Sequence, residues 1–217
     1  GDINIDTGAT VEQPDPGTGG DNGGDTGGDT GVDLPGETSG SLSLAASEAL
    51  GEEVQVQVLS GRITADTTLI NSLEDGTTVM YAIDGPTFVG GDKADSAVLT
   101  VEPGTVIFGR QGNDYLVVSR DSQIMAEGTA DAPIIMTSSQ DVLGEETAPG
   151  QWGGFIILGN APSNKCPADG SDCALQVEGA EEGAVFGGSD ETDSSGVLRY
   201  LVVKHGGFEI APDNELN

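Results

Sequence analysis

Leu99-Thr-Val-Glu-Pro-Gly-Thr-Val-Ile-Phe-Gly109 and Ile124-Met-Ala-Glu-Gly-Thr-Ala-Asp-Ala-Pro-Ile-Ile-Met-Thr-Ser138 are two versions of one pattern. In each, an apolar run ends at a Glu, passes a Gly-Thr turn and gives way to a second apolar run. The Gly-Thr pairs begin at Gly104 and Gly128, 24 residues apart (128 − 104). This spacing falls within the repeat lengths of solenoids, in which each coil stacks on the previous one.

Short β-rich runs separated by Gly, Pro, Asn and Asp continue on both sides of this repeated pattern. No amphipathic helical stretch of useful length separates them, so the chain is predicted to be all-β. We expect strands at Val79–Ile83, Thr87–Val89, Val98–Val101, Thr105–Phe108, Tyr115–Ser119, Gln123–Met125, Ile134–Thr137, Phe155–Leu158 and Val197–Val203.

In stacked coils, the inward side chains form aliphatic ladders along the axis. The expected inward residues are Leu99, Val101, Val106, Phe108, Leu116, Val118, Ile124, Ile134, Met136, Ile156 and Leu158. A two-sheet sandwich is the alternative fold.

The N-terminal part has a different composition. Residues 1–40 contain the run Gly17–Gly31, rich in Gly and Asp, and are predicted to be a disordered acidic linker because they can bury little apolar surface. A calcium-binding repeat is the alternative for this run. Residues 41–60 are predicted to form a cap with a short helix and a strand, and residues 61–217 to form the solenoid, truncated at its C-terminal end.

The charge balance excludes one class of partner. The chain has 37 acidic and 7 basic residues and a formal net charge of −30. Such a charge repels phosphate backbones, so nucleic-acid binding is not expected. No apolar run is long enough for a transmembrane helix.

Cys166 and Cys173 are the only cysteines and flank a turn containing Pro167 and Gly170. They are predicted to form a local disulfide, which implies an oxidising compartment. Two unlinked thiols are the alternative. We therefore expect an extracytoplasmic location, either secreted or on the cell surface, with any lipid anchor upstream of Gly1.

Several residues are candidates for contact with a ligand or metal. Trp152, the single Trp, has a side chain able to stack on a sugar, and Arg110 and Arg120 have charges suited to acidic glycans. Each also has a structural interpretation, such as packing at a coil corner.

An acidic loop provides the metal candidate. Asp190, Glu191 and Asp193 are the candidate ligands for calcium, which binds six to eight oxygens, and a solvated acidic turn is the alternative. No cofactor is required by the sequence. His205, the single His, follows Lys204 and has no evident nucleophile nearby in the sequence.

The quoted segments, together with Gln151-Trp-Gly-Gly-Phe-Ile-Ile-Leu-Gly-Asn160 and Val197-Leu-Arg-Tyr-Leu-Val-Val203, resemble secreted or lipid-anchored bacterial proteins with right-handed parallel β-helix repeats. The resemblance covers roughly residues 61–207. It implies a non-catalytic surface module for display, adhesion or extracellular assembly, with glycans, surface or matrix proteins, or further copies of itself as partners. The alternative is a polysaccharide lyase or hydrolase whose groove lies partly in coils beyond this chain.

Overall fold

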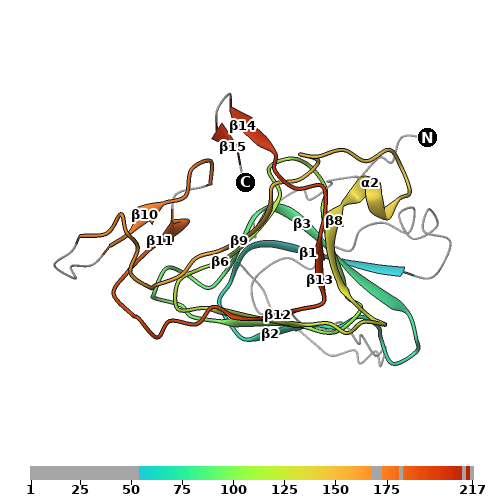
Figure 1. The fold of residues 1–217 in the computed structure, drawn as a ribbon. Coiled ribbons are helices and arrows are strands. Elements are labelled where there is room, and N and C mark those ends of the chain that lie inside the picture. The colour runs from blue at the N-terminus through green and yellow to red at the C-terminus, as the bar shows by residue number, and fades with distance from the viewer. Residues whose placement is uncertain (1–53, 168–172, 181–182, 212–213, 216–217) are drawn as a thin grey trace, which may run out of the picture.

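The computed structural model describes residues 54–167, 173–180, 183–211 and 214–215. Within these ranges the chain is a parallel β-helix with three strands per coil, and a four-residue helix, α2 (Ser139–Val142), is its single α-helix. Figure 1 looks along the stack and shows the three-sided coils. No helix of the described residues is long and apolar enough to cross a membrane.

Two faces of the stack share one seven-stranded sheet. The first face contains the first halves of β1 (Val54–Ile63) and β3 (Thr78–Val89), followed by β5 (Val106–Gly109), β8 (Ile134–Ser138) and β13 (Leu201–Val203). The second face contains the second halves of β1 and β3, followed by β6 (Tyr115–Val118) and β9 (Gly154–Ile157).

The third face is a separate four-stranded sheet. It contains β2 (Thr67–Leu69), β4 (Val98–Val101), β7 (Gln123–Glu127) and β12 (Gly196–Arg199). All pairs on the three faces are parallel, as the sequence predicts, and crossovers between parallel strands are right-handed in nearly all proteins.

The repeated Gly-Thr pattern of the sequence lies at the same corner of two successive coils. Glu102–Thr105 connects β4 to β5, and residues 128–133 connect β7 to β8, so both turns lead from the third face to the first. Gly104 has a φ of +83°, a conformation that side chains with a Cβ rarely adopt. The repeated turn therefore marks the same place in successive coils.

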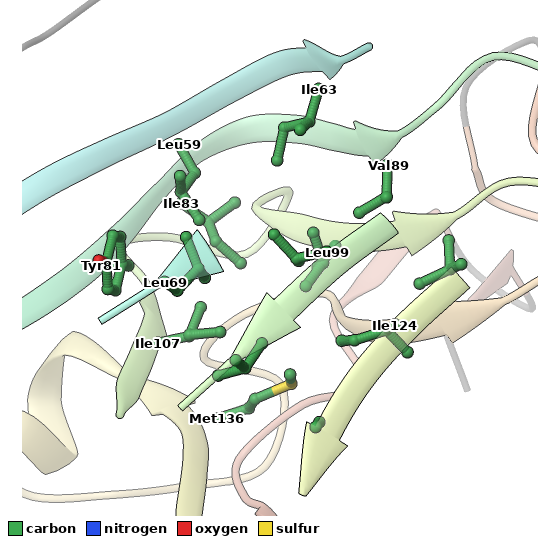
Figure 2. Packing of buried hydrophobic residues seen from close by; sticks show 14 of the residues in the cluster. Leu59, Ile63, Leu69, Tyr81, Ile83, Val89, Leu99, Ile107, Ile124 and Met136 are labelled. Carbon is green, nitrogen blue, oxygen red and sulfur yellow. The ribbon is translucent and has the colours of Figure 1, made fainter. Parts of the chain in front are cut away.

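The interior is a continuous apolar core. Strands in parallel register direct equivalent side chains to the same side, so Leu69, Val101 and Ala126 form one inward ladder, and Tyr81, Ile107 and Met136 form another. Figure 2 shows labelled side chains of this core pointing toward one another between the strands.

Most of the expected inward residues are confirmed. The core contains Leu99, Val101, Leu116, Val118, Ile124, Ile134 and Met136. Val106, Phe108, Ile156 and Leu158 are not in it, so their predicted direction was wrong. Consecutive apolar residues hide the alternation of a strand, and a shift by one residue reverses the direction of its side chains.

The structure gives the bounds of two runs that the sequence predicts. The strand expected within the cap begins at Val54, continues to Ile63 as β1 and pairs with β3. The helix expected near residues 42–50 and the linker at 1–40 lie outside the described residues. The run Val197–Val203 is divided into β12 and β13 by Tyr200, whose φ of +45° turns the chain at a corner.

Two longer connections leave the stack. Residues 139–153 connect β8 to β9 and begin with α2. Residues 158–195 connect β9 to β12 and contain an antiparallel pair, β10 (Leu175–Gln176) and β11 (Val185–Phe186). The chain continues after β13 into a second antiparallel pair, β14 (Glu209–Ala211) and β15 (Asn214–Glu215).

Candidate functional site

A charged cluster lies where β8, α2 and the residues after β13 meet. Asp141 Oδ2 accepts a hydrogen bond of 2.8 Å from Thr137 Oγ1 and forms an ion pair with Lys204 Nζ. His205 Nε2 lies 3.7 Å from Asp141 Oδ1. This is the one place where the single His of the chain meets a carboxylate and an ammonium group.

Strand stacking explains why residues so distant in sequence meet here. Val203 pairs with Met136, so the next residue along each strand, Lys204 and Thr137, are neighbours on the outer side. Ser138 caps α2 and accepts a hydrogen bond of 3.4 Å from the backbone N–H of Asp141. The cap fixes the first turn of α2 and therefore the position of the carboxylate.

The environment keeps Asp141 ionised. The hydrogen bond from Lys204 is the main reason that the pKa of Asp141 is lowered, and the hydrogen bond from Thr137 and the charges of Lys204 and His205 act in the same direction against partial burial. A carboxylate with a lowered pKa is a poor proton acceptor at neutral pH. The cluster is therefore better suited to joining α2 to the last coil than to acid–base catalysis.

Trp152 is fully buried in the main core, so its indole has no surface available to a sugar. Its Nε1 donates a hydrogen bond of 2.7 Å to the Lys204 carbonyl. The ring packs against Gly109, where an added Cβ would lie 2.4 Å from the Cβ of Trp152. Trp152 can therefore pack closely against β5 because Gly109 has no side chain.

Arg120 is also buried, with 2% of its side chain exposed. Its guanidinium binds both carboxylate oxygens of Asp92, and its Nη1 donates to the carbonyls of Cys173 and Gly187 at 2.6 and 2.5 Å. These contacts connect the turn after β6 with the connection that follows β9. The guanidinium is enclosed by protein and does not face a ligand.

Arg110 lies at a different corner, between β5 and β6. Its Nη1 is 3.3 Å from Asp84 Oδ1, and its side chain is 14% exposed. Arg110 and Arg120 are therefore not brought together as a pair for an anionic ligand. Each pairs with a different aspartate.

Asp114 is a buried residue of this corner that the sequence reasoning did not single out. Its carboxylate accepts hydrogen bonds from the backbone N–H groups of Gly85, Arg110 and Gln111 at 2.7–2.8 Å. Burial raises the pKa of Asp114, and these three donors oppose that effect. Its position in the Gly112-Asn113-Asp114 turn before a strand was the available sequence signal.

The predicted disulfide between Cys166 and Cys173 is confirmed, with the two Cα atoms 5.5 Å apart. It packs on Gly187, where an added Cβ would lie 2.9 Å from Cys166 Sγ. The connection that contains it covers the outer side of the second face, where Ala184 packs in one apolar cluster with Phe88 and Val117. The disulfide thus lies in a segment that shields apolar surface.

The acidic loop does not gather its carboxylates. Asp190 accepts hydrogen bonds from the backbone N–H and hydroxyl of Thr192, and Asp193 accepts one from the backbone N–H of Asn160, while Glu191 is exposed. Hydrogen bonding by Thr192 lowers the pKa of Asp190. Among the residues that the structure describes, no group of three or more His, Cys, Asp or Glu is arranged to hold a metal ion.

Comparison with known proteins gives one match. A family described as "Pectate-lyase like beta helix domain" matches residues 61–217, which is most of the chain and begins within β1. Neither the curated proteins nor the solved structures gave a significant match.

Proposed function

The chain belongs to the family of pectate-lyase-like β-helix domains, and we propose that it is a non-catalytic scaffold for display, adhesion or extracellular assembly. The fold alone does not assign an activity, because one fold supports many functions. The proposal rests instead on what the charged side chains do.

One observation carries the proposal. The three basic residues best suited to an acidic polysaccharide or to catalysis, Arg110, Arg120 and Lys204, all form ion pairs within the β-helix. Arg120 and Trp152 are enclosed by protein. These side chains hold corners and connections in place, which is the work of a scaffold.

The disulfide supports a location outside the cytoplasm, since such bonds persist in oxidising compartments. We propose a bacterial location, either secreted or on the cell surface. The partners proposed for the module are surface glycans and other surface or matrix proteins.

A carbohydrate-active enzyme is the second candidate, and the description of the matching family favours it. In that case, the Asp141–Lys204–His205 cluster is the place where substrate groups would meet ionisable side chains. The two functions differ in turnover, so an assay with polysaccharides separates them.

The test uses the purified 217-residue chain with polygalacturonate, pectin and neutral glucans, with calcium chloride or with sodium chloride of equal ionic strength. Ultraviolet absorbance reports unsaturated lyase products, and a reducing-sugar assay reports hydrolysis. We expect no turnover of any polymer in either salt. Turnover that is lost in both Asp141→Asn and Lys204→Gln, with the fold retained by circular dichroism, would replace the scaffold with an enzyme.

A further inference from the structure

The two cysteines of the disulfide differ in their access to solvent. Cys166 is partly exposed, and its neighbours Lys165 and Pro167 are both exposed. Cys173 is only 4% exposed. The course of thiol–disulfide exchange depends on which sulfur an incoming thiolate can reach. A thiolate that approaches from solvent therefore reaches Cys166 more readily than Cys173.

The charge next to Cys166 favours the approach of an anion. The chain carries a formal net charge of −30 and therefore repels anions in general. Lys165, one of the seven basic residues, directly precedes Cys166 and is exposed. Its ammonium group offsets the repulsion beside the accessible sulfur. This matters because the thiolate, and not the neutral thiol, is the attacking species in exchange.

The buried cysteine, Cys173, lies beside the guanidinium of Arg120. Arg120 Nη1 donates hydrogen bonds of 2.6 and 2.5 Å to the carbonyls of Cys173 and Gly187. Gly187 packs against both sulfurs, since an added Cβ there would lie 2.9 and 3.2 Å from them. Asp92 binds Nε and Nη2 of the guanidinium and offsets part of its charge. The remaining positive charge favours a thiolate on Cys173, and a sulfur that leaves readily as a thiolate makes exchange faster.

Hydrogen bonds hold the backbone of both cysteines independently of the disulfide. The N–H of Cys166 donates a hydrogen bond of 2.9 Å to the Ser163 carbonyl, and the Cys173 carbonyl binds the buried guanidinium. Gly187, on which the sulfurs pack, donates from its N–H to the Gly159 carbonyl at 2.8 Å. Reduction therefore leaves these anchors in place. The two thiols stay close together and can form the bond again.

We propose that the Cys166–Cys173 pair is a thiol-exchange site, which external dithiols reduce by attack on Cys166. One thiolate of the dithiol forms a bond to Cys166 Sγ, the bond between the two cysteine sulfurs breaks, and Cys173 leaves as a thiolate. The second thiolate of the dithiol then attacks the dithiol's own sulfur in this mixed disulfide and releases Cys166. Two electrons and two protons pass to the cysteines, and the dithiol becomes a disulfide.

This inference goes beyond the scaffold function and does not depend on it, because the exchange involves neither a glycan nor turnover of a polysaccharide. The first test treats the folded 217-residue chain with dithiothreitol and follows free thiols by alkylation and mass spectrometry. Reduction should proceed in native buffer with the circular dichroism spectrum unchanged, and removal of the reductant under mild oxidation should restore the disulfide. Reduction only after unfolding in urea, or loss of the fold on reduction, overturns the proposal.

The second test locates the attacked sulfur with a monothiol. Reduced glutathione reacts with the native chain, acid stops the reaction, and alkylation marks the released thiol before fragmentation in the mass spectrometer. Glutathione should be found on Cys166 and the alkyl group on Cys173, in excess over the reverse pattern by about tenfold. Glutathione mainly on Cys173, or equally on both cysteines, overturns the assignment of Cys166 as the attacked residue.

Lys165→Gln tests the charge beside Cys166. The variant should slow the reaction with glutathione, an anion, by more than about twofold at low salt, and it should change the reaction with the neutral thiol mercaptoethanol by less. Equal effects on the two thiols contradict the role given to Lys165. A parallel reduction with reduced thioredoxin, at the same dithiol concentration as dithiothreitol, distinguishes the two sources of a dithiol: a faster reaction identifies a protein dithiol, and a slower one a small molecule.

Discussion

Replacement of Arg120 by Met tests whether the buried guanidinium holds the disulfide-containing connection on the β-helix. The substitution keeps an apolar side chain and removes the charge. It leaves the carbonyls of Cys173 and Gly187 without their donor, at about 1–3 kcal/mol each. Asp92 loses its partner but is one-third exposed, so water screens part of that loss.

The expected loss is about 3–5 kcal/mol in the free energy of unfolding, as for other broken buried pairs. For a folded part of this size, this corresponds to a fall of roughly 6–20 °C in melting temperature. Urea unfolding followed by circular dichroism measures the free energy. Limited proteolysis should show earlier cleavage within residues 158–195.

Arg199→Met is the matched control. Arg199 also pairs with a carboxylate, that of Glu127, at 3.3 Å, but both side chains are more than half exposed. Loss of this ion pair should lower the free energy of unfolding by less than about 1 kcal/mol. If Arg120→Met costs no more than Arg199→Met, the reasoning about the buried guanidinium is refuted.

Three further changes follow from single contacts. Gly109→Ala should lower the free energy of unfolding, measured with urea, by about 1–3 kcal/mol because the added Cβ would meet Trp152. The control Gly91→Ala, whose Cβ makes only ordinary contacts, should lower it by under about 0.5 kcal/mol. Equal losses in the two variants would contradict this packing. The pKa of Asp141 is lowered in the folded state, so its ionised form stabilises the fold above the unfolded pKa of about 4, and this stabilisation is lost as pH falls through the lower, folded pKa. The difference in urea stability between wild type and Asp141→Asn should therefore persist down to about pH 4 and close below it. A difference that closes by about pH 5 would contradict this assignment. Burial raises the pKa of Tyr81 from 10.0 to about 12, so the stabilisation by its neutral phenol should persist to pH 10 and be lost as pH rises toward 12. The measurement is the difference in free energy of unfolding between wild type and Tyr81→Phe. A difference that disappears below about pH 10 would contradict a buried phenol.

The sequence predicted the strands better than the direction of their side chains. The strand runs and the corner turns at Gly104 and Gly128 were recognisable because turn residues separate them. In β5 the alternation is hidden by Val106-Ile107-Phe108, and the structure directs Ile107 inward while Phe108 packs with Val142 outside. A run of three apolar residues contains no information about which of them faces the core.

The candidate site was less predictable. The disulfide could be predicted because its two cysteines are close in sequence. The role of Arg120 was not, since its partners at Cys173 and Gly187 lie 53 and 67 residues away. The cluster at Asp141 likewise depends on the stacking of β13 on β8, which composition and motifs do not reveal.

The register between coils is the basis of every contact described above, and an in-register cross-link tests it most directly. Thr100 on β4 and Met125 on β7 are direct partners on the outer side of the third face, so their Cα atoms should lie about 4.8 Å apart. Thr100→Cys with Met125→Cys should therefore form a disulfide rapidly under mild oxidation, seen by mass spectrometry. Thr100→Cys with Gln123→Cys, two residues out of register at about 8 Å, should not, and efficient cross-linking of that control pair instead would contradict the β-helix described here.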